Sequence, residues 1–225
     1  MFKLKNNPIL YPHQITLLSL FFASPFSKTF FLTGGTALSA FYLAHRESQD
    51  LDFFSLKPFD TLALRTTMQE IAEETESEMT LQIRSQTYNE IFLKNSKKGW
   101  TQKIDIVHEQ PKHFGELINI DGIKVDSLVN IATNKILTVF GRLEPKDYID
   151  LYTIFTKTDL SFDEMFELAR QKDTGLSEFH FANTIADVEQ FETLPNLKKP
   201  FDKKQFVKFY KDLSAKLLLK IKPEE

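Results

Sequence analysis

Residues 29–38 read Thr-Phe-Phe-Leu-Thr-Gly-Gly-Thr-Ala-Leu, and residues 48–54 read Ser-Gln-Asp-Leu-Asp-Phe-Phe. The β-prone start of the first stretch stops at Gly34-Gly35, a glycine pair typical of a sharp turn. Apolar residues then recur at helical spacing, which predicts a helix over 36–44. The second stretch predicts another strand. Together they indicate a strand, a glycine turn, a helix and a strand, as in a mixed α and β fold.

The rest of the chain divides into two parts with different patterns. Up to about Ser127 short β-prone runs alternate with helical segments, and beyond it the pattern is almost entirely helical. This organisation predicts an α+β fold with a mixed α/β domain over residues 1–126 and a helical domain over 127–225. The expected strands are 29–33, 50–55, 80–84, 90–93, 103–108 and a small hairpin within 118–125, and the expected helices are 12–23, 36–44, 61–76 after an Asp60 cap, 128–140, 146–155, 165–171, 178–190 and 202–219.

The composition excludes several classes of protein. The chain has 225 residues and no cysteine, which excludes zinc fingers, iron–sulfur clusters and cysteine nucleophiles. A formal net charge of -3 argues against a protein that coats nucleic acid but leaves room for a local basic cleft. No apolar run reaches the roughly 18 residues of a membrane span, and the first residues lack the apolar core of a signal peptide. We therefore expect a cytoplasmic protein that does not enter a membrane.

Two aspartates in the second stretch carry the first chemical signal. Because side chains alternate along a strand, Asp50 and Asp52 should point to one face while Leu51 points into the core. Two neighbouring carboxylates raise each other's pKa unless a cation lies between them, and a hard cation such as Mg²⁺ prefers oxygen ligands. Asp105, in the run Lys-Ile-Asp-Ile, would complete a three-carboxylate cluster for two metals if its strand is a neighbour of theirs.

The glycine pair provides what a phosphate group requires. A turn without Cβ atoms before a helix offers close backbone approach, exposed N–H groups and the positive end of the helix dipole. Each signal also has a plainer interpretation. The two aspartates could lie on a solvated strand edge, the glycines could be only a turn, and Lys103-Ile104-Asp105 could form an outer-face ion pair that contributes ~0–1 kcal/mol. Their occurrence together and in this order favours the metal and phosphate interpretation.

Longer motifs resemble those of one family. They are Gly-Gly-Thr-Ala-Leu at 34–38, His-Arg-Glu-Ser-Gln-Asp-Leu-Asp-Phe-Phe at 45–54, Lys-Ile-Asp at 103–105 and Lys-Asp-Tyr-Ile-Asp-Leu at 146–151. Together they resemble the AbiEii/AbiGii toxin family, a branch of the nucleotidyltransferases with a DNA-polymerase-β-like fold. The resemblance implies a polymerase-β-like head, in which a small mixed sheet is flanked by helices, followed by a helical C-terminal region.

The resemblance also implies roles for matching residues of the N-terminal part. One group would bind the metal, Mg²⁺ or Mn²⁺: Asp50, Asp52 and Asp105. A second group would surround the bound NTP: Gly34, Gly35, Thr36, Arg46 and Ser48. The three residues of the glycine turn would line the triphosphate pocket. For Arg46, an ion pair with a nearby acidic residue is an equally compatible interpretation.

Two residues of the C-terminal part complete the implied set. Lys135 would contact the nucleotide phosphates from a helix, and Asp147 would either position Lys135 or assist the acceptor hydroxyl. Lys135 lies in an otherwise apolar helix, where an unpaired ammonium group would be costly, so we expect it to have a partner. A position of Lys135 on the solvent side of its helix stays open as an alternative, although its spacing from Ile131 and Leu128 weakens it. Without the resemblance, Asp147 and Asp150 would be placed on a solvated face near Lys146.

These expectations combine into a metal-dependent nucleotidyltransferase that transfers NMP from an NTP to an acceptor hydroxyl. The resemblance implies an RNA acceptor such as tRNA, a toxin-like role in a type IV toxin–antitoxin or phage-defence system, and a separately encoded antitoxin. Two alternatives stay open: transfer to a small molecule or a protein, and a non-catalytic nucleotide-binding module of the same fold. Intact Asp50, Asp52 and Asp105 favour catalysis over the non-catalytic module.

Overall fold

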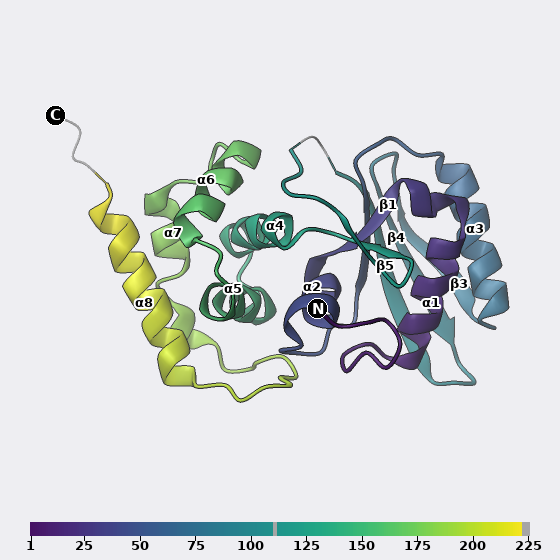
Figure 1. The fold of residues 1–225 in the computed structure, drawn as a ribbon, viewed down its shortest axis with the longest axis horizontal. Coiled ribbons are helices and arrows are strands. Elements are labelled where there is room, and N and C mark those ends of the chain that lie inside the picture. Colours follow the sequence, from purple (N-terminus) through teal and green to yellow (C-terminus); the bar gives the residue numbers. More distant parts are fainter. Residues whose placement is uncertain (110–111, 222–225) are drawn as a thin grey trace. The chain divides into compact units, whose positions relative to one another are not determined.

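A mixed β-sheet forms around the apolar run that follows Thr29 (Figure 1). The computed structural model describes residues 1–109 and 112–221, and the chain divides into two units, Met1–Leu128 and Val129–Glu225. The first unit holds a seven-stranded sheet in the order β3-β4-β5-β2-β1-β7-β6. Its strands are β1 (Phe30–Thr33), β2 (Leu51–Ser55), β3 (Glu78–Arg84), β4 (Tyr88–Asn95), β5 (Trp100–His108), β6 (Ile118–Ile120) and β7 (Ile123–Val125).

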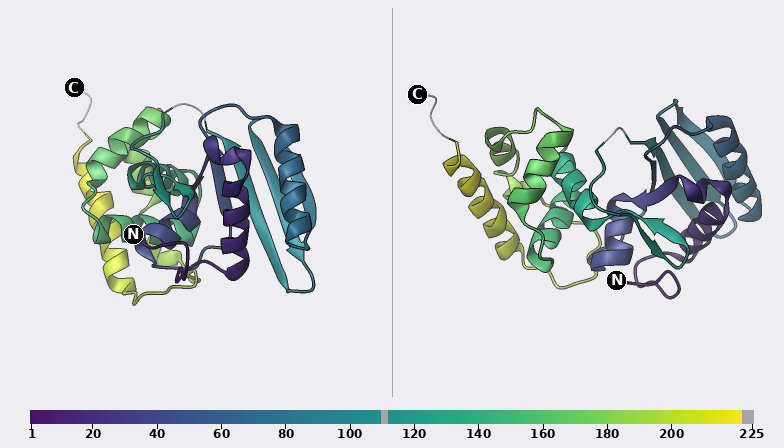
Figure 2. Two further views of the ribbon diagram at one scale, coloured as in Figure 1. Left: turned by 45° about the vertical axis from the view of Figure 1, so that its right-hand side comes forward. Right: turned by 45° about the horizontal axis from the view of Figure 1, so that its top comes forward.

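Two long helices cover one face of this sheet, α1 (Pro12–Ala23) and α3 (Thr61–Glu74) (Figures 1 and 2). The Phe53 ring of β2 stacks on the Phe21 ring of α1 with ring centroids 4.0 Å apart, and both side chains are buried. Because strand side chains alternate between faces, the neighbours of Phe53 along β2 point to the opposite face. The aromatic contacts therefore decide which face of the sheet is the core and which carries Asp52.

Most elements of the first unit confirm the sequence expectation. The α1 helix has the expected bounds, and the Asp60 carboxylate caps α3 by accepting hydrogen bonds from Leu62 N at 2.8 Å and Ala63 N at 3.1 Å. The hairpin of β4 and β5 and the small hairpin of β6 and β7 are both present. The mixed α/β content is thus confirmed, while the polymerase-β-like assignment stays a prediction.

The segment after the glycine pair differs from the single helix expected over 36–44. One α-helical turn, α2 (Gly34–Ala37), passes into a π-helical turn, η2 (Leu38–Leu43), and Ala44 ends it with a positive φ of 49°. The Ala44 N–H donates to the Ser39 carbonyl at 2.9 Å, an i to i−5 bond that widens the turn. Apolar spacing predicted a helix here but could not distinguish the wider turn from an α-helix.

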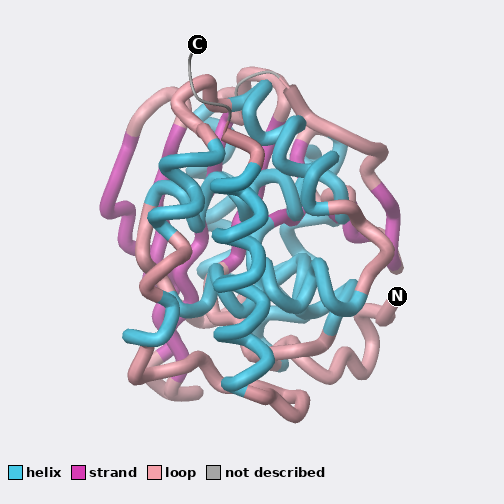
Figure 3. The backbone as a smooth tube through the Cα atoms, turned by 90° about the vertical axis from the view of Figure 1, so that its left-hand side faces the viewer, coloured by secondary structure: helices cyan, strands magenta, loops and turns pink. Residues whose placement is uncertain are grey.

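The second unit is built from helices (Figure 3). Tilted and edge-on aromatic rings lie in its core. The Tyr210 hydroxyl donates to the Tyr148 carbonyl at 2.7 Å, and both rings are fully buried. The helix expected over 178–190 is wrong in its second half, because the helix ends at Thr184 and a turn buries Ile185 before a short 3₁₀ segment. The helices are α4 (Leu128–Gly141), α5 (Pro145–Lys157), α6 (Phe162–Lys172), α7 (Glu178–Thr184), η3 (Val188–Gln190) and α8 (Lys203–Leu219).

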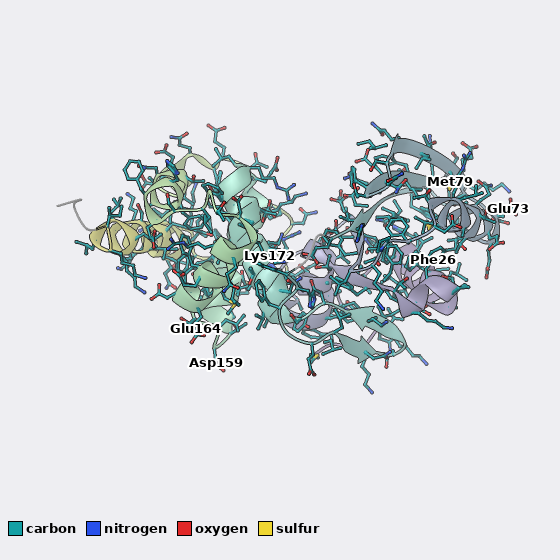
Figure 4. All side chains as sticks on the ribbon, turned by 90° about the horizontal axis from the view of Figure 1, so that it is seen from above. Phe26, Glu73, Met79, Asp159, Glu164 and Lys172 are labelled. Atoms are coloured by element: carbon teal, nitrogen blue, oxygen red, sulfur yellow. The ribbon has the colours of Figure 1, made fainter. Side chains whose placement is uncertain are left out.

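Polar contacts also join helices of the second unit. Lys172 of α6, labelled in Figure 4, donates from Nζ to the side-chain oxygens of Asn130 and Asn134, each at 2.8 Å. Both asparagines belong to α4, so the Lys172 side chain links α6 to α4. Within residues 1–109 and 112–221, we find no helix whose length and apolar character would let it span a bilayer.

Candidate active site

The backbone of Gly34 lies directly against the carboxylate of Asp52. Gly34 follows β1 with a positive φ of 69°, and a Cβ atom built on it would lie 2.1 Å from Asp52 Oδ2 and 2.8 Å from Cγ. Real Cβ atoms essentially never approach another atom so closely. Glycine is therefore required here for two reasons, the left-handed backbone and the close approach of a carboxylate.

Strand register places four polar residues side by side on the face opposite Phe53. β1 pairs antiparallel with β2, β2 pairs parallel with β5, and β5 pairs antiparallel with β4. Residues directly opposite each other on neighbouring strands share a face of the sheet. The residues that meet in this row are Thr33, Asp52, Asp105 and Glu90. β2 and β5 are thus neighbours, which is the condition on which Asp105 was expected to join Asp52.

Asp50 stands outside the strand in which it was expected. β2 begins at Leu51, so strand alternation does not fix the direction of the Asp50 side chain. The Thr36 hydroxyl, which is fully buried, donates a hydrogen bond to the Asp50 carbonyl. Thr36 therefore ties the backbone of Asp50 to the helix after the glycine pair.

Both oxygens of the Asp105 carboxylate have protein partners. Lys103 Nζ donates to Oδ2 at 2.7 Å, and the Tyr88 hydroxyl donates to Oδ1 at 2.9 Å. Lys103 Nζ also lies 3.1 Å from Glu90 Oε2. The ion pair of the plainer interpretation is therefore present, but it lies on the same face as Asp52 and is largely shielded from solvent, with Asp105 15% exposed. We call Tyr88, Glu90, Lys103 and Asp105 the β4–β5 polar cluster.

The cluster holds two groups in their protonated forms. Burial lowers the pKa of Lys103, but its hydrogen bonds to Asp105 and Glu90 outweigh burial and leave that pKa above its usual value. Burial raises the pKa of Tyr88, and the hydrogen bond to Asp105 raises it further. Lys103 is therefore an ammonium ion and Tyr88 a neutral hydrogen-bond donor at neutral pH, and both donate to the Asp105 side chain.

The second glycine lies against a buried arginine and a serine. A Cβ atom on Gly35 would lie 2.5 Å from Arg46 Nη2 and 3.2 Å from Ser48 Oγ. Arg46 is 3% exposed and Ser48 is 7% exposed, and Arg46 Nη1 donates to the Glu47 carbonyl at 2.7 Å. The structure thus brings the two residues expected to bind nucleotide, Arg46 and Ser48, to the glycine turn.

Two buried glutamines fix the segment before Asp50, and neither was identified from the sequence. Gln14 Nε2 donates to the Gln49 carbonyl at 3.1 Å, and Gln102 Nε2 donates to the same carbonyl at 2.5 Å. They come from α1 and β5 and are both almost fully buried. A buried amide that anchors a loop backbone has no local pattern, so only the fold could reveal this role.

A second missed contact lies on the other side of the glycine turn. Asp126 is fully buried, and its carboxylate accepts from the Thr33 hydroxyl at 2.5 Å and lies 2.7 Å from His113 Nε2. The Tyr42 hydroxyl donates to the Asp126 carbonyl at 2.6 Å. His113 was not singled out from the sequence. The network fixes Thr33, the residue immediately before Gly34, and so holds the start of the turn.

In the second unit, Lys135 is buried between two carboxylates. Its Nζ lies 2.7 Å from Asp147 Oδ1 and 2.6 Å from Asp150 Oδ2, and Arg142 Nε lies 2.7 Å from Asp147 Oδ2. Asp147 and Asp150 are fully buried and Lys135 is 6% exposed. The expectation that Lys135 has a partner is confirmed, and the solvent-facing placement of these three side chains is wrong. They are buried because they neutralise one another.

The charges of this cluster set the ionisation of Asp147. Burial alone would raise the pKa of the Asp147 carboxyl group, but Lys135 and Arg142 together hold it below its ordinary value. Asp147 is therefore ionised at neutral pH. Its 2.7 Å contact with Lys135 Nζ is the contact that a positioning role would require.

The residues of the first unit fit a divalent cation by their chemistry. Carboxylate oxygens suit Mg²⁺ and Mn²⁺, and Gly34 leaves the Asp52 carboxylate uncovered by a Cβ atom. In the arrangement described for residues 1–109 and 112–221, no three His, Cys, Asp or Glu side chains are gathered closely enough to hold a metal ion. Asp50, Asp52 and Asp105 as joint ligands therefore stay a proposal.

Comparison with known proteins places the chain in a family. The model of the family described as nucleotidyl transferase AbiEii toxin, type IV TA system, matches residues 16–220. The chain belongs to the AbiEii toxin family. This is a nucleotidyl transferase family, as the motifs around Gly34 and Asp52 led us to expect. Type IV toxin–antitoxin systems pair such a toxin with an antitoxin, so an antitoxin partner is implied at the level of the AbiEii family.

The chain is also similar to one further protein sequence and to two solved structures. The uncharacterized protein aq_aa25 of Aquifex aeolicus (strain VF5) is 28% identical over 145 residues, which cover 64% of this chain and 66% of that protein, just under two thirds of its length. The crystal structure of JHP933 from Helicobacter pylori has a TM-score of 0.60 at 17% identity and covers 91% of this chain and 88% of that one. A candidate nucleotidyltransferase from H. pylori has the same TM-score and identity, with 91% of each chain covered. At this identity the two structures show the fold alone.

Proposed function

We propose that this AbiEii family member is a metal-dependent nucleotidyltransferase that transfers NMP from an NTP to the hydroxyl of an RNA such as tRNA. The observation that carries the proposal is the contact of the Gly34 backbone with the Asp52 carboxylate, where a Cβ atom would lie 2.1 Å from the oxygen. A phosphate bound at the glycine turn and a cation bound at Asp52 would be neighbours. Nucleotidyl transfer requires that proximity.

The proposed reaction exchanges one phosphorus–oxygen bond for another. The acceptor hydroxyl oxygen bonds to the α-phosphorus, and the bond from that phosphorus to the oxygen bridging to the β-phosphorus breaks. Pyrophosphate leaves with the bonding electrons, and the hydroxyl proton passes to solvent. Divalent cations at the site would supply charge stabilisation and activate the hydroxyl. The protein contributes position and fixed charge, which are the main sources of rate in phosphoryl transfer.

Each proposed residue has a distinct task. Asp50, Asp52 and Asp105 would hold Mg²⁺ or Mn²⁺ through carboxylate oxygens. Gly34 and Gly35 would offer backbone N–H groups to the triphosphate, while the buried Thr36 hydroxyl keeps Asp50 in place. Arg46 and Ser48, which lie against Gly35, would orient the nucleotide.

Lys135 of the second unit would contact the nucleotide phosphates. Its ammonium group is held by Asp147 and Asp150, which fixes where its charge lies. A lysine suits this role as a compact charge for a phosphate oxygen.

The biological setting follows from the AbiEii family. We propose a toxin-like role in a type IV toxin–antitoxin system that serves phage defence, with a separately encoded antitoxin. NTPs and tRNA are both cytoplasmic, so the reaction would take place in the cytoplasm. An RNA acceptor requires a local basic patch, because the whole chain has a formal net charge of -3.

Radiolabel transfer tests the proposal. Purified protein is incubated with Mg²⁺ and each of the four α-labelled NTPs, with and without total tRNA. The Asp52→Asn variant keeps the shape of the side chain but removes its charge, and we expect it to lose at least about 10²-fold in rate. Asp159→Asn is the matched control, because Asp159 is exposed at the surface of the second unit (Figure 4).

Label on RNA with wild type and Asp159→Asn, but not with Asp52→Asn, supports the proposal. Pyrophosphate release with another acceptor, indifferent to RNA, would replace the RNA acceptor by a small molecule or a protein. Undiminished transfer by Asp52→Asn would contradict the site. Binding of NTP without any release of pyrophosphate would favour the non-catalytic module.

A further inference from the structure

The third carboxylate of the proposed site, Asp105, is blocked by a lysine two residues before it. Lys103 and Asp105 are alternate residues of β5, so their side chains lie on the same face of the sheet. Lys103 Nζ lies 2.7 Å from Asp105 Oδ2, one of the two oxygens that this carboxylate could offer to a cation. An ammonium ion and a divalent cation at one carboxylate repel each other, so the ammonium has to leave before a metal can bind.

The β4–β5 polar cluster provides a place for that ammonium to go. Glu90 stands directly opposite Asp105 in the strand register, and its Oε2 lies 3.1 Å from Lys103 Nζ. Glu90 is 12% exposed and Lys103 29% exposed, so both are partly shielded from water. A lysine shared between two carboxylates can leave one and keep the other, without becoming an unpaired charge in a shielded site.

Tyr88 keeps Asp105 in position during this exchange. Its hydroxyl donates to Asp105 Oδ1 at 2.9 Å, on the oxygen that Lys103 does not occupy. Tyr88 lies two residues before Glu90 on β4, so it projects from the same face. The carboxylate therefore retains one fixed hydrogen bond when Lys103 moves. Partners of this kind orient metal-binding carboxylates.

We propose that Lys103 is a positioning residue that neutralises Asp105 before metal binding and pairs with Glu90 alone afterwards. The inference rests on the proposed metal-dependent function, because it needs a cation at Asp105. It assigns Glu90 a task that sequence motifs do not indicate, since Glu90 is not itself a proposed ligand. The structure supports it through the three contacts that Lys103 and Tyr88 make on one face of the sheet.

The proposal predicts opposite effects for two substitutions. Glu90→Gln removes the second partner of Lys103, so the ammonium stays on Asp105 and metal binding weakens by about tenfold. Lys103→Met removes the competing charge, so metal binding becomes tighter than in the wild type. The double variant has no lysine at position 103, so the loss of Glu90 should have no further effect. The Mn²⁺ affinity of the double variant should therefore equal that of Lys103→Met and not that of Glu90→Gln. A purely structural role would weaken binding in all three.

Binding is measured with Mn²⁺ alone, by the loss of the free-ion signal in electron paramagnetic resonance, without nucleotide or acceptor. The matched controls are Lys98→Met and Glu76→Gln, an exposed lysine and glutamate of the same unit whose charged atoms are 3.8 Å apart. Both controls should bind Mn²⁺ as the wild type does. Circular dichroism verifies that each variant is folded.

Weaker binding by Glu90→Gln, tighter binding by Lys103→Met and a double variant like Lys103→Met support the proposal. Weaker binding by Lys103→Met, or a double variant as weak as Glu90→Gln, would overturn it. If the wild type binds no Mn²⁺, or if Asp52→Asn binds it as well as the wild type does, there is no metal site at Asp52 and the proposal is wrong. If Mn²⁺ binding follows the expected order but no nucleotide is transferred, the proposed function fails and the role of Lys103 stands.

Discussion

Replacing Gly34 by alanine tests the contact on which the proposed site depends. The new Cβ atom would lie 2.1 Å from Asp52 Oδ2, whereas ordinary contacts begin at 3.4 Å, so the carboxylate has to move by about 1.3 Å. A displacement of about 1 Å at a catalytic group can cost on the order of 10²-fold in rate. Alanine at a φ of 69° also costs about 1–2 kcal/mol of stability.

Gly99→Ala separates these two effects. Gly99 has a φ of 70°, nearly that of Gly34, and a Cβ atom there would meet nothing within 4 Å. Both variants should therefore lose about the same 1–2 kcal/mol in urea unfolding, but only Gly34→Ala should lose about 10²-fold in kcat/KM for labelled NTP transfer. Equal rates for the two variants would refute the argument that Gly34 exists to admit Asp52. So would a large rate loss in Gly99→Ala.

Three further predictions concern packing and charge. Asp147→Asn removes the buried carboxylate that Arg142 contacts and leaves Lys135 with Asp150 as its remaining carboxylate partner, so it should destabilise the protein by about 3 kcal/mol in urea unfolding. Because the folded-state pKa of Asp147 lies below its usual value, its stabilisation is present above about pH 4 and is lost as the pH falls through that lower pKa; the acid unfolding of Asp147→Asn should lack this component. Tyr210→Phe leaves the buried Tyr148 carbonyl without its hydroxyl donor and should cost about 1–3 kcal/mol by the same assay, with unchanged transfer by the folded protein. Phe21→Ala removes the ring stacked on Phe53 and should cost about 3–5 kcal/mol, and a loss below about 1 kcal/mol would show that α1 is not fixed by this contact.

The sequence was sufficient for the elements with local signals. Asp60 predicts a helix start because its short carboxylate can cap free N–H groups, and apolar spacing gives the inner face of α3, with Leu64, Met68, Ile71 and Ala72 all buried. The alternation in Lys103-Ile104-Asp105-Ile106 predicts β5 for a similar reason. In these cases the determining contacts are made by residues close together in the chain.

Partners distant in the chain could not be predicted. The acidic side of α5 is typical of a solvated helix face, yet Asp147 and Asp150 are buried because Lys135, from the preceding helix, lies between them. Gln14 and Gln102 meet at the Gln49 carbonyl from elements far apart in sequence. Such contacts depend on how helices and strands pack, and no local pattern encodes them.

The candidate site contains residues that local sequence signals predicted and a residue whose placement they did not predict. Gly34, Asp52 and Asp105 were identified from motif order, and the strand register places Asp52 opposite Asp105. The direction of Asp50 was not predictable, because β2 begins one residue later than the alternation implied. Lys103 had been interpreted as either part of a motif or half of an ion pair. The structure shows that the ion pair lies beside Asp52, so the two interpretations are compatible.

The fate of each phosphorus tests the central claim most directly. Wild-type protein, Mg²⁺ and total tRNA are incubated in parallel with the same NTP labelled at the α or at the γ position. Nucleotidyl transfer predicts that the α label moves to the acceptor and the γ label is released as pyrophosphate, in equal amounts. A γ label on the acceptor, or release of the γ label as single phosphate with no α label transferred, would contradict the account.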